Sequence, residues 1–494
     1  MKSNNKLFLI ALFTLLLLCA CNPAPKYVRP PAQTPAAYKE ATPDKDGQTG
    51  WKLAQPGDAT LRGKWWEIYN DPQLNALEEQ VAINNQSLKA AEANFRAARA
   101  EVVIARSALY PTIGSSPAIT NSRVSGTIAR ITSSTNTEYS LPLELSYTPD
   151  FWHRIRNQIK EEAYLAQASA ADIATALLTT QADLATDYFE LRATDMERKI
   201  LDDTMQNYRQ NVELTTTLYK TGINSEQDLV QAQNQLDTAT AQATDLGVAR
   251  AEYEHAIATL IGKPPSELTI AVAIFNPTPP QIPVGLPSTL LERRPDIAAL
   301  ERTIAAQNAA IGVARAAYYP TLTISVSGGL ESYSFEKWFS APSRFWSLGP
   351  TLSQTLFDVG ARRGQNQLAV AQYDAAVANY RQTVLTSFQA VEDQLSTLRI
   401  LTQEIGEDQT AINSSQRYLD LALIRFKAGV DSYLNVITAQ NSLLTNRESQ
   451  VAAELRRYTS SVSLVMALGG GWDPNSLPSA QDLGSKRPTP SPTP

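Results

Sequence analysis

The longest stretch of the chain without a helix breaker runs from Phe151 to Thr221 and contains no glycine or proline. Its large apolar residues are sparse, with Leu177, Leu184 and Leu191 seven positions apart and mostly Ala, Thr and Gln between them. A seven-residue spacing keeps these leucines on one helix face and favours coiled-coil packing. At 1.5 Å per residue the stretch predicts a rod of roughly 100 Å, too long for an ordinary globular domain.

Alternating apolar and polar residues predict four β-strands, two in each half of the chain. The pattern is strongest over 138–149, where apolar residues occupy every second position from Tyr139 to Tyr147. A strand of this length with an aromatic residue near each end of one apolar face is typical of a lipid-facing barrel strand. A half-buried strand of a soluble sheet is the alternative. The other predicted strands cover about 111–127, 320–331 and 344–357. Pro117 weakens the first of them, because proline cannot donate to a strand ladder.

Three short motifs occur twice in the same order and indicate an internal duplication. Residues 105–112 (ARSALYPT) return 209 positions later as 314–321 (ARAAYYPT). Two more motifs return 207 positions later, YKTG at 219–222 as FKAG at 426–429, and LVQAQN at 229–234 as VITAQN at 436–441. We therefore predict a first repeat over 73–272, a proline-rich linker over 273–287 and a second repeat over 288–472.

Each repeat is predicted to contain a helix, a pair of strands, a very long helix, a tight turn and a second helix. The long helices cover about 151–221 in the first repeat and 361–428 in the second, and the first repeat opens with helical character from about Gln73 to Leu109. The expected fold class is mainly α with a small β part, built from two structural repeats.

The first 21 residues have the pattern of a bacterial export signal followed by a lipid attachment site. Lys2 and Lys6 precede an apolar run over 7–18 that is too short to span a bilayer comfortably. The sequence Leu-Cys-Ala-Cys ending at Cys21 resembles a lipobox, so we expect residues 1–20 to be removed and Cys21 to be acylated. An ordinary signal peptide that happens to contain cysteines is the alternative.

Two segments flank the repeats. Residues 21–72 are rich in Pro, Ala, Gln, Gly and Asp and show no period, which predicts a lipid anchor followed by an extended arm that lies on the rest of the protein. Residues 473–494 are rich in Pro, Thr and Ser and predict a disordered tail.

Composition narrows the classes of function. Hydrophobic residues make up 43% and charged residues 19% of the chain, which does not fit a bundle of transmembrane helices. The net charge of −6 argues against nucleic acid as a partner. With two cysteines and two histidines, and no catalytic partner at useful spacing from His153 or His255, we expect no metal site, no enzyme activity and no cofactor besides the covalent lipid.

Four strands do not close a barrel, and an open sheet edge is not stable in lipid. Bacterial barrels have at least about eight strands, so the chain is expected to form a symmetric oligomer, in which two copies would be the minimum and three would supply twelve strands. A periplasmic scaffold or adhesion lipoprotein built from coiled coils is the alternative from another class. It accounts for the long helices and leaves the tyrosine-flanked strand without a purpose.

The lipobox, the duplicated unit of strand pair and long helix, the two ARxAxYPT motifs and the turn sequence FKAGVDSYLNVITAQN together resemble the outer-membrane factor family. This is the TolC-like family, and the likeness is greatest to its lipoprotein branch, the OprM- and NodT-like outer-membrane subunits of efflux transporters. The resemblance implies a homotrimer in the cell outer membrane, with a twelve-stranded barrel, twelve helices closed into a periplasmic barrel, and an equatorial belt made from the chain ends and the linker.

The resemblance also implies a function. Members of the family export drugs or other small molecules passively through a continuous tunnel. The cargo is handed over by an inner-membrane pump of the resistance-nodulation-division type, coupled through a periplasmic adaptor, or membrane fusion, protein. The outer-membrane channel of a type I-like polypeptide secretion system is the alternative, because the inner-membrane partner decides the cargo.

The resemblance places the gate at the periplasmic end, where the helix turns that face the adaptor fall at Gly222 and Gly429. Glycine suits these reversals because it tolerates positive φ. Relatives commonly carry paired acids just after the second turn. This chain has Asn435 and Thr438 there, with Asp228 at the corresponding place of the first repeat.

Five side chains are therefore candidates for the gate. Asp228 either lines the constriction, where three copies would meet on the axis, or lies elsewhere at the tip, and Asn435 and Thr438 occupy the positions of the missing acids. Asp431 is predicted to cap the helix after the second turn. Phe426 stands where relatives often have tyrosine, so we expect it to keep the helix packing and lose the hydroxyl hydrogen bond.

Overall fold

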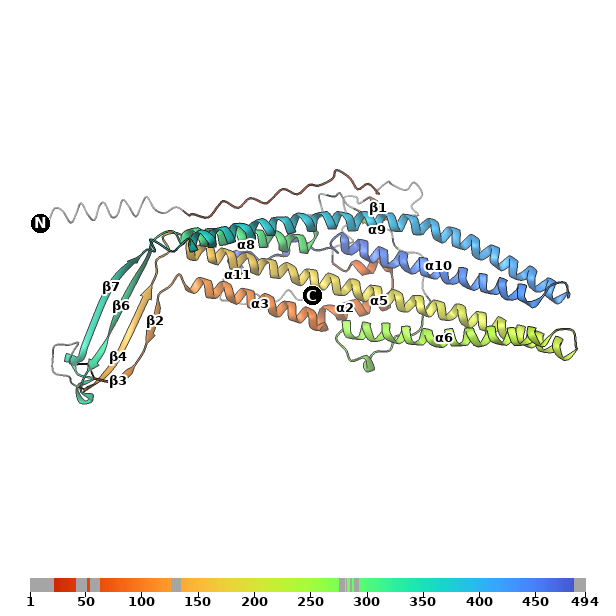
Figure 1. Ribbon diagram of the computed structural model, residues 1–494, viewed down its shortest axis with the longest axis horizontal. Coiled ribbons are helices and arrows are strands. Elements are labelled where there is room, and N and C mark those ends of the chain that lie inside the picture. Colours follow the sequence, from red (N-terminus) through yellow and green to blue (C-terminus); the bar gives the residue numbers. More distant parts are fainter. Residues whose placement is uncertain are drawn as a thin grey trace.

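Two helices of 67 residues each form the long axis of the molecule, α5 (Arg154–Lys220) and α9 (Ala361–Lys427). Each ends in a tight turn and is followed by a 35-residue helix that runs back beside it, α6 (Glu226–Leu260) after α5 and α10 (Tyr433–Ala467) after α9. In the computed structural model both turns lie at one end of the molecule and a small β-sheet lies at the other (Figure 1). The mainly helical fold class and its two repeats are as the sequence predicted.

The structure describes residues 22–40, 51–53, 63–123, 125, 135–274, 280, 282–284, 287 and 293–483. The predicted signal peptide over 1–20 and the predicted lipidation site at Cys21 lie outside these residues. Within the described ranges, no helix combines the length and apolar character needed to cross a bilayer.

An aspartate a few residues before each long helix accepts hydrogen bonds from backbone N–H groups of its first turn, whereas the N-cap residues His153 and Gly360 make no capping bond of their own. Asp150 accepts hydrogen bonds from the backbone N–H groups of Ile155 and Arg156 at 3.1 and 3.0 Å. In the second repeat Asp358 accepts one from the backbone N–H of Arg362 at 3.3 Å. A carboxylate at this place satisfies N–H groups that have no partner inside the helix and lies at the positive end of the helix dipole. Local chemistry therefore sets where both rods begin.

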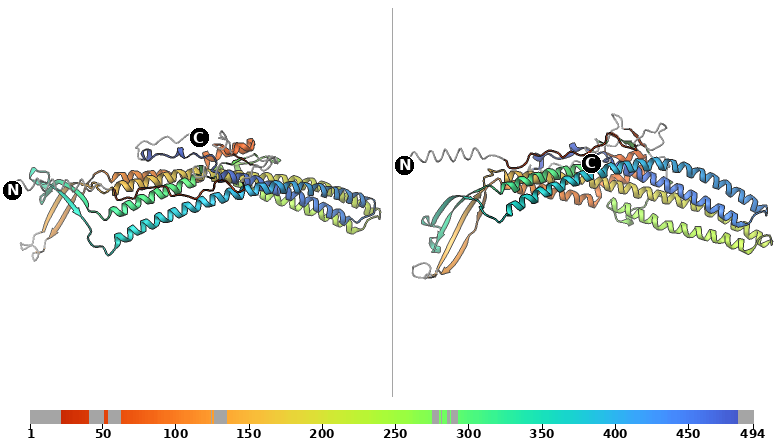
Figure 2. Two further views of the ribbon diagram at one scale, coloured as in Figure 1. Left: turned by 90° about the horizontal axis from the view of Figure 1, so that it is seen from above. Right: turned by 45° about the horizontal axis from the view of Figure 1, so that its top comes forward.

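In each repeat a 22-residue helix begins where the returning helix ends. α3 (Gln86–Ser107) meets the end of α6, and Asn85 Nδ2 donates to the carbonyl of Leu260 at 2.8 Å. α8 (Pro295–Ala316) meets the end of α10, and Arg294 Nη1 donates to the carbonyl of Ala467 at 3.0 Å. The returning and the short helices thus continue one another alongside the long rods (Figure 2).

Two glycines 207 positions apart make this end-to-end contact possible. Gly262 and Gly469 have φ angles of +71° and +92°. A Cβ would lie 2.4 Å from the carbonyl oxygen of Asn84 at the first position and 2.3 Å from that of Arg293 at the second. Only glycine combines positive φ with so close a backbone approach. The duplication therefore extends to the junction between helices.

The sheet takes strands from both repeats. β2 (Thr112–Ser115) and β3 (Ala118–Arg123) both pair with β4 (Thr135–Tyr147), which pairs with β6 (Thr321–Ser332), which pairs with β7 (Arg344–Ser353). All pairings are antiparallel. The prediction of one continuous strand over 111–127 is wrong. The strand is interrupted at Ser116 and Pro117, because proline has no N–H group to donate to the ladder.

The molecule has its largest core halfway along the helices. The 3₁₀ helix η2 (Trp65–Tyr69) and helix α2 (Pro72–Asn84) pack here against α5 and α10, and the ring of Phe189 lies 5.0 Å from Tyr69 and 4.8 Å from Tyr458. β1 (Trp51–Leu53) pairs in parallel with β5 (Ile282–Val284), which joins the N-terminal segment to the linker. The remaining short helices are η3 (Pro265–Glu267), η4 (Phe335–Lys337), η5 (Ala341–Ser343), η6 (Pro474–Ser476) and α11 (Ala480–Leu483).

A buried ion network ties the start of the linker to this core. Arg192 of α5 contacts Asp195 at 3.0 Å and donates to the carbonyl of Ala271 at 2.8 Å and to Gln73 Oε1 at 2.7 Å. Arg250 of α6 reaches the other oxygen of Asp195 at 2.8 Å. Arg192 and Asp195 are nearly inaccessible to water, so each charge depends on the other for solvation.

The two chain ends follow the helices lengthwise. Residues 22–40 form an extended arm, in which Tyr27 donates to Glu301 Oε1 of α8 at 2.5 Å and the backbone N–H of Lys39 donates to Glu392 of α9 at 2.7 Å. The predicted disorder of 473–494 is wrong for its first part. Residues up to Leu483 pack along α5, where Gln167 Nε2 donates to the carbonyl of Pro478 at 2.9 Å and Leu483 is buried against α3 and α5. Residues 484–494 lie outside the described part.

Candidate gate at the helix turns

The two helix turns lie together at the end of the molecule farthest from the sheet (Figure 1). One apolar cluster joins them: Ala232 of α6 packs with residues of α9 and α10, and Leu214 and Leu218 of α5 lie against the same cluster. The two hairpins therefore form one tip in the folded chain.

Both turns have the same backbone geometry. After α5 the N–H of Gly222 donates to the carbonyl of Tyr219 and the N–H of Ile223 to that of Leu218, both at 2.9 Å. After α9 the N–H groups of Gly429 and Val430 make the equivalent bonds at 2.9 and 3.0 Å. This is a Schellman motif, which needs a residue with positive φ at the glycine position. Gly222 and Gly429 have φ angles of +73° and +71°.

Asp431 does not cap α10, contrary to the sequence prediction. The N-cap residue is Ser432, and its side chain makes no capping hydrogen bond. Arg425 instead draws the carboxylate of Asp431 back across the turn, with Nε to Oδ2 at 2.5 Å and Nη2 to Oδ1 at 3.3 Å. The hydrogen bond from Arg425 lowers the pKa of Asp431. The guanidinium of Arg425 bonds to both carboxylate oxygens of Asp431, which explains why the carboxylate pairs with Arg425 and does not cap α10.

Asp228 lies in the first turn of α6, where it is partly exposed. Its backbone N–H donates to Ser225 Oγ at 3.3 Å, and that hydroxyl donates to Asp228 Oδ2 at 3.1 Å. The carboxylate also lies near Tyr433 of the other hairpin, whose pKa is raised by burial first, and further by the charges of Tyr208 and Asp228. Asp228 thus stabilises a helix start and carries a negative charge near the second hairpin.

Asn435 and Thr438 are exposed on α10 just beyond the second turn. The hydroxyl of Thr438 donates to the carbonyl of Leu434 in the same helix at 2.9 Å. Asn435 lies beside Asp431 and contributes to the lowered pKa of that carboxyl. Neither side chain supplies a charge, so Asp228 and Asp431 are the acids of the candidate set.

Phe426 is buried at the end of α9 and packs on Tyr433 with ring centroids 5.2 Å apart. Tyr433, which is not among the predicted gate residues, is 1% exposed and packs in the cluster formed by α6, α9 and α10. Its burial follows from helical spacing with Val436, Ile437 and Gln440, which are also buried. That spacing was the available signal for its role.

Large apolar side chains are exposed at the tip. Ile223 and Val430, the residues after the two turn glycines, are 69% and 65% exposed. Four more are at least half exposed on the helices leading into and out of the turns: Val230, Leu421, Ile424 and Leu434. Apolar surface of this extent at one end of a molecule is typical of a protein contact site.

No metal-binding arrangement accompanies these residues. Across the part of the chain that the structure describes, no group of three or more His, Cys, Asp and Glu side chains is placed to hold an ion.

Comparison with known proteins gives consistent matches along the chain. Residues 77–263 and 286–470 match the family model described as outer membrane efflux protein. The chain is 30% identical over 468 residues to the solvent efflux pump outer membrane protein SrpC of Pseudomonas putida, covering 94% of this chain and 98% of SrpC. It is 30% identical over 481 residues to the pyoverdine export outer membrane protein OpmQ of Pseudomonas aeruginosa, covering 95% and 98%. The solved structure of the outer-membrane channel OprN matches with a TM-score of 0.81 at 29% identity, over 92% of this chain and 100% of that one.

Proposed function

Because the chain belongs to the outer membrane efflux protein family, we propose that it is the outer-membrane channel of a tripartite efflux system, through which small molecules leave the cell passively. It resides in the outer membrane, and its helices extend into the periplasm. The two family segments coincide with the two repeats, each of which contributes strands to the sheet and a pair of helices to the tip.

The observation that carries this proposal is a sheet that is incomplete on its own. β2 and β3 form one edge and β7 the other, and each edge strand pairs on one side only within the described residues. On β7, Trp346, Leu348 and Leu352 are 82%, 63% and 69% exposed. An apolar face with unpaired edges is suited to lipid only when the edges are closed. β2 and β3 follow one another along β4 and occupy one position in the sheet, so each chain fills four positions. Three copies therefore provide twelve, enough for a barrel in a homotrimer.

The partners follow from the family and from the exposed tip. An inner-membrane pump of the resistance-nodulation-division type supplies drugs or other small molecules, and a periplasmic adaptor protein joins the two. The exposed side chains of Ile223 and Val430 give the adaptor an apolar surface at the tip. A polypeptide secretion channel remains the second candidate, since the same pore serves a different inner-membrane partner. SrpC and OpmQ carry names for solvent and pyoverdine export, which favours small molecules.

Acylation of Cys21 completes the proposal. Asn22, the next residue, accepts a hydrogen bond from Asn157 Nδ2 at 2.9 Å, close to where α5 leaves the sheet. The carbonyl of Pro25 accepts one from Asn308 Nδ2 at 2.9 Å. These contacts hold the start of the arm next to the sheet, where a lipid on Cys21 could enter the membrane beside the strands. The intact mass of the purified protein tests this: acyl groups should be present in the wild type and absent after Cys21→Ser.

The experiment for channel function is single-channel conductance of the purified, acylated protein in a planar bilayer, at neutral and acidic pH, beside its native mass in detergent. A trimer with discrete conductance steps supports the channel. A monomer that binds membranes and never conducts supports the scaffold alternative and rejects the proposal.

A further inference from the structure

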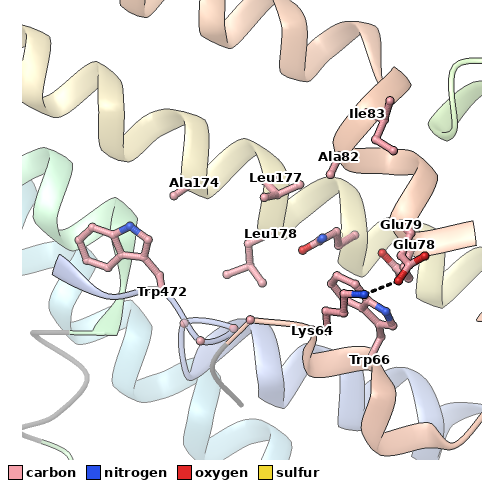
Figure 3. A pocket seen from close by; sticks show the side chains of 15 residues that line it. Lys64, Trp66, Glu78, Glu79, Ala82, Ile83, Ala174, Leu177, Leu178 and Trp472 are labelled. Atoms are coloured by element: carbon pink, nitrogen blue, oxygen red, sulfur yellow. Dashed lines mark hydrogen bonds and ion pairs between the residues drawn. The ribbon is translucent and has the colours of Figure 1, made fainter. Parts of the chain in front are cut away.

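A cavity of about 540 Å³ opens beside α2, which lies between the sheet and the helix turns in Figure 1. Figure 3 shows this cavity from close by. Helix α2 contributes Ala82 and Ile83 to its wall, and α5 contributes Leu177 and Leu178. The loop after α10 closes another side with its three consecutive glycines and Trp472. Its size and apolar lining are those of small-molecule sites in proteins.

Glu78 of α2 borders this cavity and has no exposed surface. Neither of its carboxylate oxygens has a hydrogen-bond partner among the described residues, and the indole N–H of the neighbouring Trp66 is likewise buried and unbonded. Burial raises the pKa of Glu78 well above its usual range. A carboxyl group buried without a partner destabilises the fold, so its presence here needs a reason.

The charged groups around the cavity do not neutralise Glu78. Lys64 at the rim pairs with Glu79, as the dashed line in Figure 3 shows. Glu79 accounts for most of the raised pKa of Lys64, and Glu78 is not among the groups that act on it. From α5 the neighbour at the cavity is the neutral Gln181, and from η2 the titratable neighbour is Tyr69, a phenol with a raised pKa. Glu78 therefore faces no cation from any of these elements.

We propose that this cavity binds a small amphipathic cation, with its apolar body between Leu178, Ile83 and Trp66 and its ammonium group paired with Glu78. Figure 3 shows Trp472 at one side of the cavity and Trp66 and Glu78 at the other, with Leu178 between them. Turning of the Glu78 side chain into the cavity brings the carboxylate to the ligand. Such a pair supplies the hydrogen bonds that the buried carboxyl lacks and favours its charged form.

The test uses the full-length protein and a matched pair of probes, cyclohexylmethylammonium and the neutral cyclohexylmethanol, with binding measured by calorimetry. Glu78→Gln keeps the shape of the side chain and removes its charge. We expect it to weaken ammonium binding about tenfold or more and to leave alcohol binding unchanged. Glu79→Gln, at the rim, is the control and should change ammonium binding by less than about threefold.

A pH series separates pairing with Glu78 from nonspecific partition. Because a bound cation requires ionised Glu78, ammonium affinity should rise with pH from 5 to 8 in the wild type and stay flat in Glu78→Gln. Leu178→Trp fills the cavity and should abolish binding of both probes. Each variant is checked for wild-type native mass and melting temperature. No ammonium binding by the wild type, or equal binding by wild type and Glu78→Gln, overturns the proposal.

Discussion

Arg425 at the end of α9 and Asp431 after the turn form an ion pair that spans the second helix turn, with Nε 2.5 Å from Oδ2. The equivalent places of the first turn, 207 positions earlier, hold Leu218 and Asn224, which carry no charge. Two turns with the same backbone geometry are therefore stabilised differently, since an ion pair spans the second and the equivalent positions of the first carry no charge.

We expect Asp431→Asn to loosen the second turn and leave the first unchanged. Hydrogen exchange of the amides around Gly429 should accelerate, while exchange around Gly222 serves as the internal reference. Because Arg425 lowers the pKa of Asp431, the pair contributes stability at neutral pH and loses it only as the pH falls through that lowered pKa in strongly acidic solution. Equal acceleration at both turns would mean that the mutation acts on the tip as a whole.

The glycines at the helix junctions should tolerate substitution less well than those at the turns. Gly469→Ala combines positive φ with a Cβ placed 2.3 Å from the backbone oxygen of Arg293. Gly429→Ala meets no atom within 4 Å, so it carries only the cost of positive φ, about 1–2 kcal/mol. Melting temperatures should therefore fall in the order wild type, Gly429→Ala, Gly469→Ala. A larger loss for Gly429→Ala would contradict the steric argument.

The long helices were predictable because their signal is local. The stretch expected to be helical over 151–221 forms α5 over Arg154–Lys220, and that over 361–428 forms α9 over Ala361–Lys427. Nothing in either stretch competes with helix formation except Gly364 and Gly406, whose cost of about 1 kcal/mol each is small beside the packing of a long rod. Because the motifs occur twice, the elements of the second repeat could be predicted from those of the first.

The features that could not be predicted from the sequence depend on contacts between residues far apart in the chain. Leu483 is held by α3 and α5, more than 300 positions earlier, so composition alone suggested a disordered tail. At Asp431 capping was the local expectation, but Arg425 lies within reach only after the turn has formed. Glu78 shares the helical spacing of its buried neighbours Leu74, Leu77 and Val81, but a carboxylate is rarely fully buried, so its residue type favours an exposed position. In each case tertiary packing overrides the local preference.

Removing Arg192 should destabilise the protein far more than removing an exposed lysine from the same helix. Arg192→Met leaves buried Asp195 with Arg250 as its remaining ionic partner, at an expected cost of about 3–5 kcal/mol. Lys199→Ala breaks an exposed pair with Asp203 and should cost less than about 1 kcal/mol. Thermal unfolding of both variants measures the difference. Similar melting temperatures would show that the network adds little to stability.

Titration of Glu161 is expected to make the stability of the protein depend on pH. Burial, and then the charge of Glu162, raise the pKa of this half-buried residue of α5 to about 7. The folded state thus holds the proton more tightly than the unfolded chain, so stability falls as the pH rises through the range up to about 7. Glu161→Gln should melt above the wild type at pH 8 and close to it at pH 5. Glu213→Gln changes an exposed residue of the same helix, so its melting temperature relative to the wild type should be the same at pH 5 and pH 8.

Asp228 is the candidate gate residue that a conductance experiment tests most directly. If its carboxylate lines the closed tip, Asp228→Ala should raise the leak conductance in a planar bilayer, because charge in a narrow pore is poorly screened by water. The same mutation also removes the bond with Ser225, so Ser225→Ala is the matched control: it breaks the contact and keeps the charge. A raised leak in Asp228→Ala alone assigns the charge to the gate. Equal leaks in both variants assign the effect to the start of α6, and unchanged conductance in Asp228→Ala rejects the gate role.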